Sequence, residues 1–205
     1  MIRFHRNDLP AEASFGEAVA IDTETLGLAV GRDRLCVVQL SRGDGTADIV
    51  QIAPGQTSAP NLERLLADPA IVKLFHFGRF DMAVMQHAFG VMAAPIYCTK
   101  IASKIARTYT DRHGLKDLTR ELLNVEISKQ QQSSDWGAGT LSEAQLAYAA
   151  SDVLHLHALR EKLDAMLTRE GRDGLARAAF VYLPDRVRLD LAGFEAMDIF
   201  SHGYP

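Results

Sequence analysis

The sequence has little cysteine and no long apolar segment. Its 205 residues include two cysteines, Cys36 and Cys98, and neither belongs to a C-x-x-C motif. This pattern excludes the usual zinc-site spacing and a disulfide framework, so we expect a reducing compartment such as the cytoplasm. The apolar runs are too short to span a bilayer, and residues 1–15 lack the apolar centre of a signal peptide. We therefore expect no membrane association.

An excess of basic residues is also missing. Lysine and arginine number 22 against 26 aspartates and glutamates, which gives a formal net charge of −4 at pH 7. Proteins that grip many phosphates along a nucleic acid usually carry a basic surface. Any contact with nucleic acid is therefore expected to be local and to cover few phosphates.

Internal repeats and low-complexity segments are absent as well. The length and the 47% apolar content are those of one ordinary globular domain, to which we assign residues 1–184. Residues 185–205 form a predicted C-terminal tail with the apolar residues Leu189, Leu191, Phe194, Met197, Ile199 and Phe200. So much apolar surface at a chain end predicts docking, either on the same fold or on a neighbouring subunit.

The order of predicted elements indicates an α/β domain with a mixed sheet. Strands are predicted at 17–23, 34–41, 46–52 and 71–77, and an Asp-Gly pair predicts a hairpin between the second and third of them. Helices are predicted at 61–68, 79–90, 98–109 and 114–124, and a further one begins at a capping box formed by Ser142 and Gln145. The polar stretch 126–140 is predicted to be a surface loop.

Two acidic residues stand inside the first of these strands. Asp22 and Glu24 follow the apolar run Ala18–Ile21, and because strand side chains alternate, both carboxylates should point to the same side. Two like charges on one face of a buried strand repel each other unless a cation neutralises them. Hard divalent cations prefer oxygen ligands, so the pair predicts a site for Mg²⁺ or Mn²⁺.

Further acidic residues lie in apolar surroundings later in the chain. Asp81 is in the first turn of a predicted helix, where it could simply complement the helix N-terminus. Tyr148 and Asp152 are four residues apart on a helix and therefore share a face. Taken singly, each of them has an ordinary structural explanation; taken with Asp22 and Glu24, they suggest one carboxylate cluster.

These segments resemble the three motifs of the DEDD 3′–5′ exonucleases. The matching stretches are "DTET" at 22–25, "HFGRFD" at 76–81 and "YAASD" at 148–152, and the tyrosine of the last one is typical of the DEDDy branch, which includes ribonuclease D. The resemblance covers about residues 15–170. With its short length and segments such as "DIFSHG" near the end, the chain most resembles nanoRNase C. Phe77 departs from the wider ribonuclease D pattern, in which an asparagine commonly follows the histidine.

The resemblance implies a ribonuclease H-like mixed sheet flanked by helices, the DEDD exonuclease fold. It also implies two divalent cations, Mg²⁺ or Mn²⁺, roughly 3.5–4 Å apart, which activate a water and stabilise the leaving oxygen. NanoRNase C enzymes are stand-alone bacterial proteins that cleave dinucleotides at the end of RNA decay. They form ring-shaped octamers, and activity on DNA has also been attributed to the group.

Site residues follow from the same resemblance. Asp22, Glu24, Asp81 and Asp152 would hold the metals, and Tyr148 would orient the attacking water. The expected substrate contacts come from Thr23, Thr25, His76 and Leu28, the last as an apolar wedge between two bases. Ordinary core packing is an equally good interpretation of Leu28, since an isolated leucine is usually buried.

A dinucleotide-specific enzyme also needs groups that cap the 5′ phosphate. Two polar clusters offer such groups, although solvated loops explain both of them more simply. They comprise Lys129, Gln132, Ser133 and Ser134, and Arg112, His113 and Lys116. His155 and His157 are predicted to lie beside Asp152 on the same helix, but their spacing does not make a zinc site, so we interpret them as packing or surface residues.

Three functional hypotheses remain at this point. The first is a metal-dependent 3′–5′ oligoribonuclease that produces nucleoside 5′-monophosphates from very short RNA. The second is a general 3′–5′ exonuclease on longer RNA or DNA. The third is a non-catalytic nucleic-acid-binding protein on the same fold, which the presence of all four carboxylates and Tyr148 disfavours.

Overall fold

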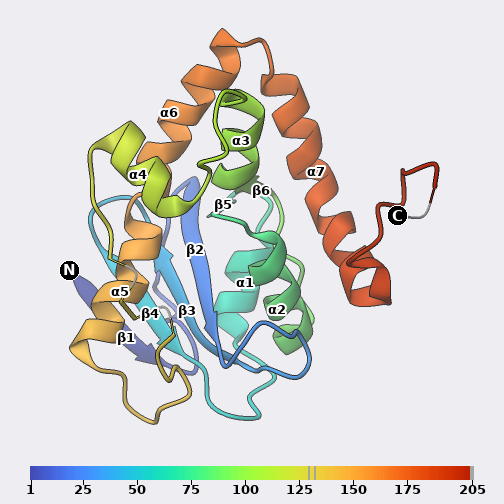
Figure 1. Cartoon of the computed structure of the whole chain (residues 1–205). Helices are drawn as coiled ribbons and strands as arrows, with labels where there is room; N and C mark the ends of the chain where they lie inside the picture. The colour runs from blue at the N-terminus through green and yellow to red at the C-terminus, as the bar shows by residue number, and fades with distance from the viewer. Residues whose placement is uncertain (129, 132, 204–205) are drawn as a thin grey trace.

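The computed structural model describes residues 1–128, 130–131 and 133–203. A six-stranded sheet in the order β1-β4-β3-β2-β5-β6 forms its centre (Figure 1). The strands are Ile2–Arg6 (β1), Ala18–Thr25 (β2), Leu35–Ser41 (β3), Ala47–Gln51 (β4), Val72–Phe75 (β5) and Ile96–Cys98 (β6). The helices are Pro60–Ala67 (α1), Arg79–Phe89 (α2), Thr99–Ala106 (α3), Leu115–Leu123 (α4), Glu143–Leu154 (α5), Leu156–Arg169 (α6) and Asp173–Leu189 (α7), followed by a π-helical turn at Asp190–Phe194 (η1).

The sheet mixes antiparallel and parallel pairings, which confirms the predicted fold class. β2 lies near its middle, antiparallel to β3 and parallel to β5, and the β3–β4 hairpin is present as expected. α5 packs against β1 to β4, and α1 lies on the opposite face (Figure 1). All of β3 is buried, as is β2 from Val19 to Ile21, whereas Asp22 and Glu24 further along β2 are half-buried.

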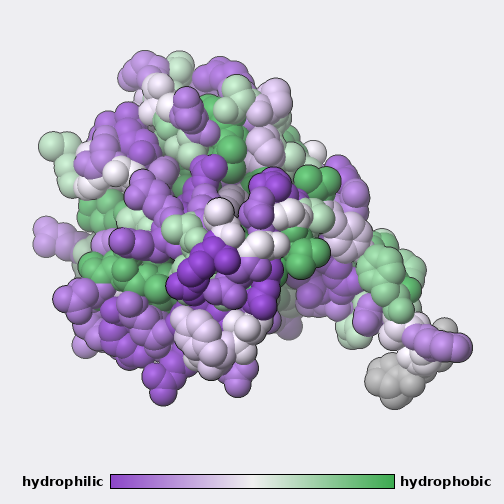
Figure 2. All heavy atoms as spheres, turned by 90° about the horizontal axis from the view of Figure 1, so that it is seen from above, coloured by the Kyte–Doolittle hydropathy of each residue, from purple (hydrophilic) through white to green (hydrophobic). Residues whose placement is uncertain are grey.

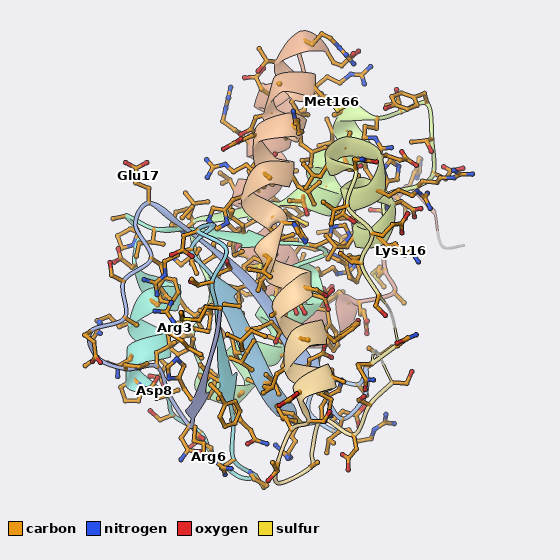
Figure 3. All side chains as sticks on the ribbon, turned by 90° about the vertical axis from the view of Figure 1, so that its left-hand side faces the viewer. Arg3, Arg6, Asp8, Glu17, Lys116 and Met166 are labelled. Atoms are coloured by element: carbon orange, nitrogen blue, oxygen red, sulfur yellow. The ribbon has the colours of Figure 1, made fainter. Side chains whose placement is uncertain are left out.

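The two outer strands were not anticipated from the sequence. In β1 the side chains alternate between exposed and half-buried, and the strand carries Arg3 and Arg6, so it lacks a continuous apolar run (Figure 3). β6 has three residues, too few for any periodicity to show. Because Cys98 ends β6, the helix predicted at 98–109 begins one residue later, at Thr99, and it ends at Ala106.

Two boundaries in the C-terminal half also need correction. α5 ends at Leu154 and α6 starts at Leu156, so His155 and His157 are not on the helix that carries Asp152. His155 lies at the junction, where its backbone breaks the helix. α7 runs through Pro184 to Leu189 and buries Val187, so the last core helix extends past the boundary we placed after residue 184.

The segment after α7 projects away from the rest of the molecule. Its apolar side chains are partly exposed, from 40% for Phe194 to 78% for Phe200, and they appear as a green patch on the projecting arm in Figure 2. Arg79 and Arg186 both pair with Asp190, which ties the start of the segment to α2 and α7. Its role in docking stays a prediction. Among the described residues, no helix combines the length and apolar character needed to cross a bilayer.

A buried lysine of β5 holds together the segments that lead into β5 and β6. Lys73 is 0% exposed, and its Nζ donates to the carbonyl oxygens of Asp68, Ile71 and Ala94 at 2.5, 2.8 and 2.6 Å. Burial lowers the pKa of this amine to about 8, so at pH 7 it still carries the proton needed for all three bonds.

We expect Lys73→Met to lower the free energy of unfolding by roughly 2–4 kcal/mol, because three carbonyls lose a charged donor. Urea denaturation followed by circular dichroism measures this effect. Lys104→Met, at an exposed position of α3, is the matched control and should change little. Equal stabilities of the two variants would contradict the structural role of Lys73.

Candidate active site

Three of the predicted carboxylates meet at one point. Asp22 and Glu24 come from β2 and Asp152 comes from α5, and one oxygen of each lies within 4.8 Å of the others. The strand alternation explains why Asp22 and Glu24 share a side, and the packing of α5 on β2 brings Asp152 to them. All three are half-buried, so the cluster is reachable from solvent while its charges remain poorly hydrated.

Asp81 lies behind this cluster and outside the 4.8 Å group. It is 5% exposed, and its Oδ1 accepts hydrogen bonds from the backbone N–H of Thr23 at 3.1 Å and from the Thr23 hydroxyl at 2.6 Å. Thr23 lies between Asp22 and Glu24 on β2, so its bonds to Asp81 hold the backbone of β2 in place between the two acidic residues. The N–H and hydroxyl of Thr23 are thus engaged with Asp81, and its contact with substrate stays a prediction.

The carboxylates raise one another's pKa values. Burial, followed by repulsion from Asp81 and Asp152, raises the pKa of Asp22 well above its ordinary value. Burial and the same two neighbours raise the pKa of Glu24 to about 9, and burial raises that of Asp81 to about 6. Such a cluster favours the binding of either protons or cations, because both remove the repulsion.

Tyr148 adjoins the cluster on α5. Burial raises its pKa, and the charges of Asp152, Glu24 and Asp22 act in the same direction, so the phenol keeps its proton at neutral pH. Trp136 packs against it with ring centroids 6.0 Å apart. A protonated phenol can donate a hydrogen bond and orient a neighbouring group, which suits a positioning role better than that of a base.

The other predicted substrate contacts differ in exposure. Leu28 is 84% exposed, so the interpretation as core packing is wrong, and its apolar side chain is free on the loop after β2. The hydroxyl of Thr25 donates to Gly27 O at 2.5 Å. His76 is half-buried and pairs through Nδ1 with Thr99 Oγ1 at 2.9 Å. Burial, Lys100 and His113 lower its pKa, so it is neutral at pH 7.

Phe77, next to His76, has an unusual backbone. Its φ of 68° lies in the left-handed region, and its ring is 48% exposed with Lys100 Nζ 4.2 Å from the centroid. A bulky residue in this conformation is strained, and such strain tends to occur at functional positions. The sequence marked Phe77 only as a departure from the ribonuclease D pattern.

The two clusters considered for the 5′ phosphate differ in structure. Ser133 is exposed and Ser134 donates to Gln131 Oε1, while Lys129 and Gln132 lie outside the described residues. Arg112 is exposed and Lys116 is half-buried on α4 (Figure 3). His113 pairs with Ser103 Oγ at 2.8 Å. Their roles stay predictions.

Gln39 was missed entirely by sequence reasoning. It lies on β3 directly opposite Asp22, is 0% exposed, and donates from Nε2 to Asp22 Oδ2 at 2.7 Å. The only hint in the sequence is a lone amide in the apolar strand "LCVVQLS".

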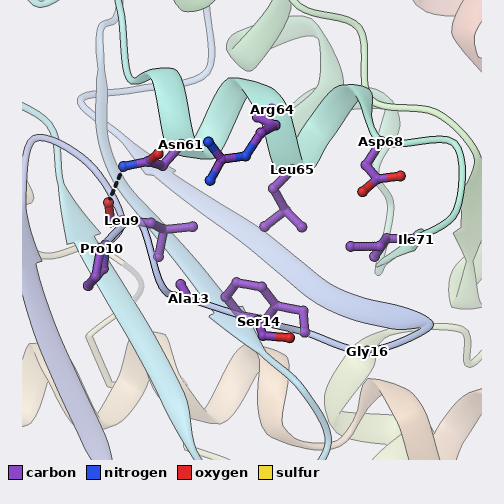
Figure 4. Close-up of a pocket in the computed structure, with 11 residues that line it drawn as sticks. Leu9, Pro10, Ala13, Ser14, Gly16, Asn61, Arg64, Leu65, Asp68 and Ile71 are labelled. Carbon is purple, nitrogen blue, oxygen red and sulfur yellow. Dashed lines mark hydrogen bonds between the residues drawn. The ribbon is translucent and has the colours of Figure 1, made fainter.

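A separate surface hollow contains none of these residues. It lies between the loop before β2 and α1 and encloses about 210 Å³, with Asn61 Nδ2 donating to Leu9 O at 2.8 Å on its wall (Figure 4). This hollow is therefore separate from the carboxylate cluster.

Comparison with known proteins agrees with this geometry. A family model described as 3′–5′ exonuclease matches residues 5–168. Ribonuclease D of Gluconacetobacter diazotrophicus is 40% identical over 154 residues, which are 75% of this chain and 39% of that protein. The chain therefore spans about two fifths of the length of that relative.

Two solved structures are similar over nearly the whole chain. Brucella melitensis NrnC with bound Mg²⁺ has a TM-score of 0.95 and 62% identity, covering 98% of this chain and 99% of that one. Brucella melitensis NrnC bound to pGG has a TM-score of 0.96 and 62% identity, covering 98% of both chains.

Proposed function

The chain belongs to the 3′–5′ exonuclease family, close to nanoRNase C, and we propose that it hydrolyses very short RNA, dinucleotides above all, to nucleoside 5′-monophosphates. The observation that carries this proposal is the convergence of Asp22, Glu24 and Asp152 within 4.8 Å, with Tyr148 on the same helix as Asp152.

The donor set fits divalent cations. Half-buried carboxylates without cysteine or histidine among them suit Mg²⁺ or Mn²⁺, and their raised pKa values reflect repulsion that a cation would remove. The bound Mg²⁺ of the similar Brucella structure supports this assignment. We assign Asp22, Glu24, Asp81 and Asp152 to two metals, which when bound supply activation of water and stabilisation of the leaving oxygen.

The protein's own groups then have separate tasks. Asp22, Glu24, Asp81 and Asp152 would hold the cations, and Asp81 also keeps Thr23 in place. Tyr148 orients the attacking water through its hydroxyl. Leu28 stands exposed where it can separate two bases, and Thr23, Thr25 and His76 complete the proposed contacts to the 3′ end.

Short RNA is favoured as substrate for two reasons. The similar Brucella structure is bound to pGG, a dinucleotide. The net charge of −4 is a poor match for the long phosphate backbone of a structured RNA or DNA. General exonuclease action on longer RNA or DNA is the alternative, since the curated relative is a ribonuclease D.

We also propose that the enzyme acts in the cytoplasm as a homo-oligomer, an octameric ring by family resemblance. The free, buried Cys36 and Cys98 are compatible with a reducing compartment. The exposed apolar side chains after α7 supply surface for subunit contacts.

Product analysis on 5′-labelled RNAs of about two to seven nucleotides tests the proposal. With Mn²⁺ or Mg²⁺ present, we expect the dinucleotide to be cleaved fastest and the product to be a 5′-monophosphate. Equal rates for all lengths would overturn the dinucleotide preference but leave an exonuclease. If RNAs of every length stay intact, the hypothesis of a non-catalytic nucleic-acid-binding protein would remain.

Leu28→Ala should reduce kcat/KM on dinucleotides by roughly 10-fold, because an apolar contact of about 1.5 kcal/mol with the bases is lost. Steady-state kinetics on a labelled dinucleotide measures this. Leu175→Ala serves as the control, since Leu175 is 65% exposed on α7, outside the motifs. Parent-like kinetics of Leu28→Ala would remove Leu28 from the substrate site.

A further inference from the structure

Gln39 is a buried amide in a strand that is otherwise suited to apolar packing. All seven residues of β3 are buried, and Gln39 itself is 0% exposed. Burying an amide costs free energy unless its polar atoms are hydrogen-bonded. A leucine or methionine at this position would pack without that cost, so the amide needs an explanation beyond filling space.

The hydrogen bonds of the amide point to one partner. Nε2 donates to Asp22 Oδ2 at 2.7 Å, whereas Oε1 is buried without a hydrogen-bond partner among the described residues. The fold therefore satisfies only one half of the amide, the half that contacts the carboxylate. A bond to a charged acceptor is stronger than one between neutral groups.

The register of the sheet fixes this contact. Gln39 and Asp22 are directly opposite each other in the antiparallel β2–β3 pair, so their side chains lie on the same face of the sheet. An Asp22 carboxylate without such a donor could rotate about its last torsion. With Nε2 bound to one oxygen, the carboxylate is held in one orientation relative to Glu24 and Asp152.

We infer that Gln39 is a positioning residue of the metal site, which orients the Asp22 carboxylate so that it can share cations with Glu24 and Asp152. This inference rests on the metal site of the proposed function. It assigns Gln39 no contact with substrate. Groups that orient metal ligands commonly change metal affinity by about 10- to 100-fold when removed.

The test compares Mn²⁺ binding by the parent, Gln39→Met and Ser41→Ala. Free Mn²⁺ is measured by electron paramagnetic resonance during a titration, a readout that does not depend on activity. Ser41 is the matched control because it is buried on the same strand and face, and its hydroxyl donates to Thr46 O at 2.7 Å. We expect Gln39→Met to weaken Mn²⁺ binding at least about 10-fold and Ser41→Ala to leave it unchanged.

Two further measurements separate positioning from a general structural role. Gln39→His retains an N–H donor and should keep Mn²⁺ affinity closer to that of the parent than Gln39→Met does. Dinucleotide hydrolysis by Gln39→Met should recover as Mn²⁺ is raised, whereas loss through misfolding would not. If Gln39→Met does not fold, as judged by circular dichroism, Gln39→Leu is measured in its place.

Parent-like Mn²⁺ affinity in the folded Gln39 variant would overturn the inference, as would an equal loss in Ser41→Ala. Failure of the parent to bind Mn²⁺ would overturn it together with the metal site. A parent that binds Mn²⁺ but hydrolyses no RNA would refute the proposed function alone, and the role of Gln39 would stand if its variants lose affinity.

Discussion

Asp22→Asn is expected to lower kcat on a dinucleotide by at least roughly 10³-fold, because the loss of one central ligand removes electrostatic stabilisation of the transition state. Asp22 interacts with every other acidic residue of the site. Repulsion from Asp81, Asp152 and Glu24 raises its pKa, and Gln39 donates a hydrogen bond to its carboxylate. Steady-state kinetics at saturating Mg²⁺ measures the effect.

The same substitution should stabilise the protein when cations are chelated. The raised pKa of Glu24, about 9 against an ordinary 4.5, means that the folded state binds a proton more tightly than the unfolded state does. Stability without metal therefore falls as pH rises from about 4.5 to about 9. The pKa of Asp22 is itself raised well above its ordinary value, mainly by burial, so removing this carboxylate removes its own contribution to that loss. In EDTA at pH 8 we expect Tm to rise by about a few degrees.

Asp117→Asn is the charge-matched control for both measurements. Asp117 forms a surface pair with Arg120 on α4, and such pairs contribute little. Full turnover by Asp22→Asn in excess Mg²⁺ would show that the reaction does not need the Asp22 carboxylate and would contradict its assignment as a metal ligand.

Tyr148→Phe should reduce kcat about 10²- to 10⁴-fold and leave Mn²⁺ affinity near that of the parent. The substitution removes a hydroxyl beside the cluster but keeps the ring that packs against Trp136. Since burial and the nearby carboxylates raise the pKa of Tyr148, its loss should not remove a titrating limb from the pH–rate profile below pH 9.

Kinetics and Mn²⁺ titration of the same preparation distinguish the possible roles of Tyr148. Tyr109→Phe is the control, because Tyr109 is 71% exposed and its hydroxyl accepts from Arg107. A large fall in Mn²⁺ affinity would indicate that Tyr148 supports the metal site instead. An unchanged kcat would exclude it from the reaction.

Local patterns were enough to predict part of this site. Alternation along β2 places Asp22 and Glu24 on one side, and that placement follows from strand geometry alone. The meeting with Asp152 could not be derived in this way, because no local pattern states where a helix packs on a sheet. The motif resemblance supplied that step, and the 4.8 Å cluster agrees with it.

Other features escaped prediction for physical reasons. The sequence around an isolated leucine does not show whether its side chain is buried or exposed. The exposure of Leu28 depends on the conformation of the loop after β2, which the local sequence does not determine. The bond between Asp81 and Thr23 joins residues 58 positions apart, and β6 is too short to show periodicity. We placed the start of the tail after residue 184, but α7 continues through Pro184 to Leu189, because the packing of this helix overrides the tendency of proline to end it.

The pairing of β2 on both flanks has a consequence for insertions and deletions. Ala20 is paired with Ser41 on one side and with Leu74 on the other, so the strand cannot slide without breaking two ladders. Adding or removing a single amino acid before Asp22 within β2 would turn every following side chain to the opposite face of the sheet. Thr23 and Thr25 would then lie where Asp22 and Glu24 lie now. Such an insertion or deletion would therefore remove the acidic residues of β2 from the cluster.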